Sequence, residues 1–156
     1  MSLFKGLFGG KGSGLKPEER AELEQYLAAA DPLLRQLDSE YGQWLERAGI
    51  TRGTDLSGIN DPKGEHSGVF VWRTIETERT FTQLHPPRRA MRLHDHYVSC
   101  VEGRHTAASL VYDALQVADV RSPKAALAHA SQGLAEAEQH RKRAEREREH
   151  LERLLR

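Results

Sequence analysis

The fold is decided by residues 90–119, AMRLHDHYVSCVEGRHTAASLVYDALQVAD, and residues 123–155, PKAALAHASQGLAEAEQHRKRAEREREHLERLL. In both stretches, small or apolar residues recur at alternating steps of three and four. That spacing keeps one face of an α-helix turned toward a partner. Between the stretches, Ser122 can cap a helix and Pro123 suits its first position. We therefore predict two long helices, 87–119 and 123–155, that fold back on each other around a short turn.

A third long helix is predicted over residues 17–48. Proline at its first position and two glutamates in its first turn favour a helix start. A heptad pattern of apolar residues continues through Pro32, where we expect a kink. Gly49 offers the left-handed conformation that ends many helices. No carboxylate falls on this apolar seam, so we expect the helix to bring no acidic group into the bundle.

The middle of the chain is the hardest part to assign. Residues 49–68 have the glycine, proline, aspartate and asparagine content of a loop. Residues 69–84 contain threonines and aromatics that favour a strand, but their spacing also fits a helix. We predict a short helix, because a lone strand would have no partner elsewhere in the sequence. The fold class is then all-α: an elongated antiparallel bundle of three long helices and one short extra helix, forming one domain over residues 17–156.

The composition agrees with an elongated domain that has a narrow core. Of 156 residues, 38% are hydrophobic and 29% are charged, which suits helices that bury one stripe. The 23 basic residues equal the 23 acidic ones, so no overall positive field attracts nucleic acid. The apolar run 69–72 is far shorter than the about 20 residues that span a bilayer. The single cysteine, Cys100, fits a reducing compartment, and we expect a cytoplasmic protein.

The first sixteen residues form an N-terminal tip and a glycine-rich tether, and they differ from the rest of the chain. Four apolar residues and one lysine would share a side of a two-turn helix. These residues are Leu3, Phe4, Leu7, Phe8 and Lys5. The tip resembles the amphipathic start of membrane-remodelling proteins of the ESCRT-III and phage-shock type, over this segment alone. A disordered start, a membrane anchor and a docking peptide are the alternatives, and an anchor would make the protein peripheral to the membrane.

The eight histidines raise the alternative of a metal site. Glu102 and His105 have the Glu-x-x-His spacing that di-iron carboxylate bundles use for ligands. If the last two helices pair symmetrically about their turn, Glu102 and His105 lie near Glu138 and His140. The alternative function is therefore a ferritin-like metal-binding bundle. Against it, arginines surround the chain's second Glu-x-x-His spacing and oppose a divalent cation.

Two polar residues, His94 and Arg104, fall on the predicted seam. Polar seam residues can fix helix register at some cost in stability. A buried His94 would alternatively make assembly pH-dependent, because acidification below about pH 6.5 charges a histidine. Cys100 lies beside the seam without an activating base, so we expect no nucleophilic role.

The final segment, residues 139–156, is rich in arginine. Arg141 and Arg148 fall on its seam, so we expect this end to project beyond the bundle. It can pair between subunits, or meet acidic lipid or nucleic acid, and we place nucleic acid behind self-association. The seam residues expected to pack the bundle or its subunits are Leu127, Leu134, Leu151 and Leu155.

No catalytic signature is recognisable, and we expect no cofactor. The predicted function is a non-catalytic helical scaffold or oligomerisation module. The tip would recruit it to a membrane face or a larger assembly. The expected partners are another copy of the chain, a protein assembly or an anionic membrane surface.

Overall fold

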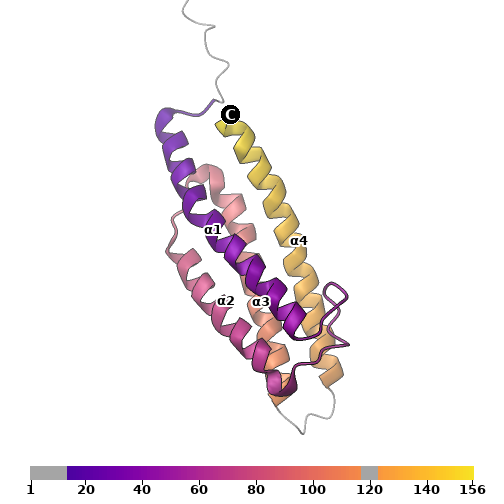
Figure 1. Ribbon diagram of the computed structural model, residues 1–156. Coiled ribbons are helices and arrows are strands. Elements are labelled where there is room, and N and C mark those ends of the chain that lie inside the picture. The colour runs from indigo at the N-terminus through magenta and orange to yellow at the C-terminus, as the bar shows by residue number, and fades with distance from the viewer. Residues whose placement is uncertain (1–13, 117–122) are drawn as a thin grey trace, which may run out of the picture.

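The computed structural model describes residues 14–116 and 123–156, and it contains four α-helices there. Consecutive helices run in opposite directions along one bundle (Figure 1). No strand occurs in the two described ranges, so the all-α prediction is confirmed. The elements are α1 (Pro17–Arg47), the 3₁₀ turn η1 (Pro62–Gly64), α2 (Glu65–Gln83), the 3₁₀ turn η2 (Arg88–Ala90), α3 (Met91–Gln116) and α4 (Pro123–Leu155).

The sequence predicts both ends of α1 to within one residue. The helix runs unbroken through Pro32 and stops at Arg47. Beyond it, Gly49 has a φ of +69°, and the amide of Ile50 donates to the carbonyl of Leu45 at 2.8 Å. A left-handed glycine followed by this backward hydrogen bond is a common helix ending.

The predicted helix at 69–84 is present, but its predicted start is wrong. α2 begins earlier, because the buried carboxylate of Asp61 accepts the Ser67 amide at 2.8 Å and the Ser67 hydroxyl at 2.6 Å. Such side-chain acceptors satisfy the unpaired amides of a first turn. Gly68 lies within α2, and a glycine is needed there because the Tyr112 ring of α3 lies where a side chain would be, 2.8 Å from an added Cβ. With 19 residues, α2 is a full member of the bundle rather than a short extra helix.

The core lies along the axis of the bundle. α3 packs closely against both α2 and α4, and α1 packs against α2. At Gly103 of α3 an added Cβ would be 2.9 Å from the Cβ of Ala137, which shows how closely α4 approaches. The backbones of α1 and α4 approach much less closely. The largest fully buried apolar side chains are those of Leu23, Leu37, Leu56, Phe81, Leu93, Tyr97, Val101, Val111, Leu134 and Leu151.

Two predicted features lie outside the described residues. They are the N-terminal tip, whose attachment residues fall within residues 1–13, and the turn between α3 and α4, most of which falls within residues 117–122. Among the described helices, none has the length and hydrophobicity needed to cross a membrane.

Candidate functional site

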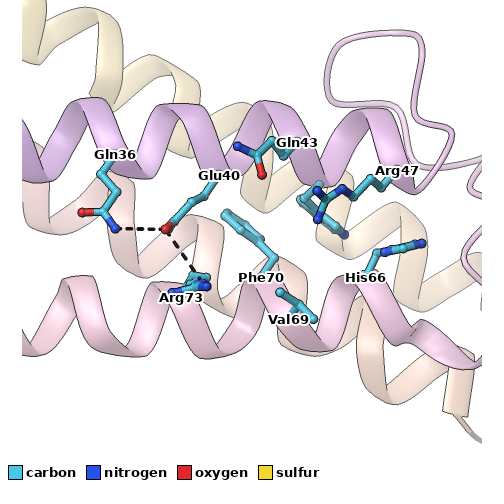
Figure 2. A pocket seen from close by; sticks show the side chains of 9 residues that line it. Gln36, Glu40, Gln43, Arg47, His66, Val69, Phe70 and Arg73 are labelled. Carbon is cyan, nitrogen blue, oxygen red and sulfur yellow. Dashed lines mark hydrogen bonds and ion pairs between the residues drawn. The ribbon is translucent and has the colours of Figure 1, made fainter.

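A groove of about 330 Å³ lies between α1 and α2. Figure 2 shows side chains from both helices lining it, with polar groups along its rim. The antiparallel pairing of these helices brings the second half of α1 against the first half of α2. The lining residues, which we call the α1–α2 groove, are Gln36, Glu40, Gln43, Trp44, Arg47, His66, Val69, Phe70 and Arg73.

The floor of the groove is aromatic. The rings of Trp44 and Phe70 are stacked, with centroids 4.9 Å apart and planes 10° apart. Tyr41 lies beside both rings, and burial raises the pKa of its hydroxyl to about 12. Trp44 is held by a hydrogen bond from its Nε1 to the hydroxyl of Ser67 at 2.9 Å. The floor is therefore a packed aromatic surface with one hydrogen-bonded ring.

The rim of the groove carries charge. Glu40 accepts a hydrogen bond from Gln36 at 3.1 Å, and the same carboxylate oxygen lies 4.0 Å from Nε of Arg73. Its other oxygen is buried and has no hydrogen-bond partner among the described residues. Arg47 and His66 lie at the opposite end of the groove (Figure 2). The nine lining residues include no serine, threonine or cysteine, and their ionisable groups are those of Glu40, Arg47, His66 and Arg73.

The outer face of α2 exposes large apolar side chains beside this groove. Trp72 is 70% exposed and Val69 is 51% exposed. Exposed tryptophan is typical of binding surfaces, where it contributes much of the binding energy. The exposed residues that follow one another along this face, which we call the α2 stripe, are Glu65, Val69, Trp72, Glu76 and Arg79.

A set of ion pairs joins α1 to α3 and α4. Asp38 pairs with the buried Arg104 at 2.7 Å and with Arg141 at 3.0 Å. Asp31 pairs with Arg148 at 2.7 Å. The expectation that α1 brings no acidic group into the bundle is therefore wrong. Asp31 and Asp38 flank the apolar seam and are partly buried. Arginines on α3 and α4 reach them because their side chains are long.

The C-terminal part of α4 packs on the bundle, which corrects the expectation that it projects beyond it. Arg141 and Arg148 contact α1 through the ion pairs above, and two of its basic groups are thereby occupied within the fold. Of the predicted packing residues, two are buried and two are partly buried against the chain's own core. The buried ones are Leu134 and Leu151, and the partly buried ones are Leu127 and Leu155.

The four residues of the metal alternative do not converge. His105 shares a hydrogen bond with Thr74 of α2 at 2.8 Å, and His140 lies against His96, with the two Nδ1 atoms 3.2 Å apart. Glu102 is exposed and Glu138 is half-buried on α4. Nowhere in residues 14–116 and 123–156 do three histidine, cysteine, aspartate or glutamate side chains meet in a way that could hold a metal ion. Glu102 and His140 do line one surface groove between α3 and α4, as the symmetric register predicts, whereas His105 is bonded to α2.

Two other seam residues have defined partners. His94 shares a hydrogen bond with the Tyr26 hydroxyl at 3.0 Å, and burial lowers the pKa of His94. The guanidinium of Arg104 lies 4.2 Å from the ring centroid of Tyr41, a cation–π contact. Cys100 is fully buried, and burial raises the pKa of its thiol to about 11. Each of these residues contacts other side chains or is buried in the interior of the bundle.

Comparison with known proteins identifies no relative of this chain. No family model, curated protein or solved structure matches it.

Proposed function

We propose that the chain is a non-catalytic helical scaffold that joins other macromolecules through the exposed face of α2. The observation that carries this proposal is the 70% exposure of Trp72 beside Val69. Interior ionic groups such as Arg104 and Asp38 are engaged in pairs that hold helices together. The molecule thus offers a rigid body and a binding face, which are the two requirements of a scaffold.

The N-terminal tip is the proposed means of recruitment. Its apolar residues Leu3, Phe4, Leu7 and Phe8 and its basic Lys5 suit an anionic lipid surface or a groove on a larger assembly. A helix of two turns is unstable alone in water, so its formation would depend on that surface. α1 begins directly after the tether, and the tip would therefore transmit its attachment to the bundle through α1.

Vesicle co-sedimentation tests this recruitment. The full chain is mixed with anionic vesicles, beside a chain lacking residues 1–14 and a full-length variant in which Leu3, Phe4, Leu7 and Phe8 are all serine. We expect the full chain to sediment with the vesicles and both altered chains to stay in solution. The serine variant is the matched control, because it keeps the charge and length of the tip.

The mass of each chain, measured by light scattering, separates the remaining outcomes. If the altered chains have a lower molar mass than the full chain, and none of the three binds vesicles, the tip is part of a protein assembly. Equal behaviour of all three chains in both measurements would contradict recruitment by the tip.

A further inference from the structure

We propose that the α2 stripe binds the same stripe of a second copy of this chain, with the two α2 helices antiparallel and Trp72 on the two-fold axis between them. This inference rests on the proposed scaffold function and names its partner. The seam leucines of α4 are used within the chain's own core. Self-association therefore requires another surface, and α2 provides one.

The spacing of the α2 stripe suits helix pairing. Its members follow one another at steps of four, three, four and three residues, from Glu65 to Arg79. This is the heptad pattern that keeps a narrow face of one helix turned toward another helix. Trp72 is the middle member, seven residues from each end. Glu65, Trp72 and Arg79 therefore coincide with their own reverse about Trp72, as an isologous two-fold contact requires.

The charges of the stripe select the antiparallel arrangement. A two-fold axis through Trp72 places Glu65 of each copy opposite Arg79 of the other, so two opposite-charge pairs form. A parallel arrangement would place like charges opposite each other, which is unfavourable. Among the described residues, Glu65 and Arg79 take part in no other ion pair. Both are exposed and available.

Apolar contact supplies the centre of the interface. On the axis, Trp72 would lie against Trp72 of the second copy and against its Val69. A large aromatic side chain buries about 150–250 Å² when fully covered, so the central contact is substantial but small for a permanent dimer. Glu76 lies 3.9 Å from Arg73 of its own helix, so its charge has a partner within the same copy. The expected dimer is weak and reversible, and it forms at high chain concentration.

Charge reversal at the two ends of the stripe tests the pairing on the full-length chain. Sedimentation equilibrium gives the dimer dissociation constant of the wild type and of Glu65→Arg and Arg79→Glu variants. Each variant alone places two like-charge pairs across the interface, and we expect its dimer to be about tenfold weaker. In an equimolar mixture of the two variants, a heterodimer has both pairs complementary again. We expect this mixture to regain the wild-type affinity, a result that a general loss of folding would not produce.

Two further substitutions serve as a matched pair. Trp72→Ala should weaken the dimer about thirtyfold or more, because the side chain is lost on both sides of the axis. Met91→Ala removes another exposed apolar side chain, 52% exposed but on α3, and should change nothing. Helix content measured by circular dichroism confirms that every variant is folded.

The outcomes for self-pairing and for recruitment are separate. The antiparallel pairing would be overturned if the wild type stayed monomeric at all concentrations. It would also be overturned if the mixture of the two charge variants dimerised no more tightly than each variant alone. A dimer insensitive to all α2 substitutions would also overturn it. None of these results depends on vesicle binding by the tip, which the α2 variants should retain.

Discussion

Arg148 of α4 binds Asp31 of α1 with two nitrogens, its Nη2 at 2.7 Å and its Nε at 3.1 Å from the carboxylate. A second aspartate–arginine pair lies seven residues along each helix, where Nε of Arg141 donates to Asp38 at 3.0 Å. Because the helices are antiparallel, the earlier aspartate meets the later arginine. Two side-chain bridges therefore join helices whose backbones approach much less closely than those of α3 and α4.

Asp38→Asn should lower the free energy of unfolding by about 3 kcal/mol. The substitution leaves Arg104, whose side chain is 4% exposed, without its ionic partner in the interior. A buried unpaired charge is strongly unfavourable. Urea unfolding followed by circular dichroism measures the change. Glu24→Gln, which removes an exposed pair with Arg20 on the same helix, is the control and should change stability by less than about 0.5 kcal/mol. Equal effects of the two substitutions would contradict the structural role of Asp38.

Gly103→Ala and Gly133→Ala should have opposite effects. An alanine Cβ at Gly103 would lie 2.9 Å from the Cβ of Ala137, so α3 and α4 must move apart. We expect a net loss of about 1–2 kcal/mol, after the better helix propensity of alanine is included. At Gly133 the nearest atom would be 3.9 Å away, and the same exchange should stabilise by up to about 1 kcal/mol. Thermal unfolding of both variants decides this, and destabilisation by both would show that the tight contact at Gly103 is not special.

Stability should fall as the solution becomes acidic, partly through the His96 and His140 pair. Burial and then the neighbouring His140 and Arg143 lower the pKa of His96, and Glu147 and Asp95 oppose this only in part. Below the ordinary value of 6.5 the unfolded chain takes up a proton that the folded chain resists, so the free energy of unfolding decreases as pH falls.

Unfolding of the wild type and His96→Gln between about pH 7.5 and about pH 5.5 tests this dependence. We expect a smaller loss of stability in the variant, because glutamine has no proton to gain. Identical pH profiles would show that this histidine pair does not contribute. His94 should add a similar dependence of its own, since burial lowers its pKa as well.

Cys100 should react with a thiol reagent only after unfolding. Its side chain has no exposed surface, and burial raises the pKa of the thiol to about 11, so little thiolate exists near neutral pH. Alkylation followed by mass spectrometry should therefore be slow in buffer and fast in urea. Rapid labelling of the folded chain would mean that α3 opens at this position. The same burial excludes a disulfide between two folded chains.

Local patterns in the sequence predict most of the helices. Proline at the first position of α1 and the glycine after its end act on neighbouring residues, so both boundaries can be read without the fold. The start of α2 cannot be predicted in this way, because Gly68 has a residue type that is typical of a loop. The fold explains this glycine, since the Tyr112 ring, which is distant in sequence, leaves no space for a side chain there.

The candidate site is much harder to predict. The heptad pattern identifies the buried face of each helix, but it does not give the side-chain contacts between helices. It therefore misses the contact of His140 with His96 and the hydrogen bond that His105 shares with Thr74. It also misses Asp31 and Asp38, although a signal exists. Their spacing of seven residues equals that of Arg141 and Arg148, and two seam arginines require acidic partners. Trp72 is exposed because it lies on the side of α2 that faces away from the core. The sequence does not predict this, since its apolar pattern allows more than one side of the helix to face the core.

The two bridges between α1 and α4 have a mechanical consequence. A load applied to the N-terminal end of α1 is directed along the helix axis, whereas both ion pairs lie across the space between the helices. Such a load shears Asp31 from Arg148 and Asp38 from Arg141 at the same time. Because both pairs share one spacing of seven residues, a shift of α1 by one heptad would leave a charge unpaired at each end.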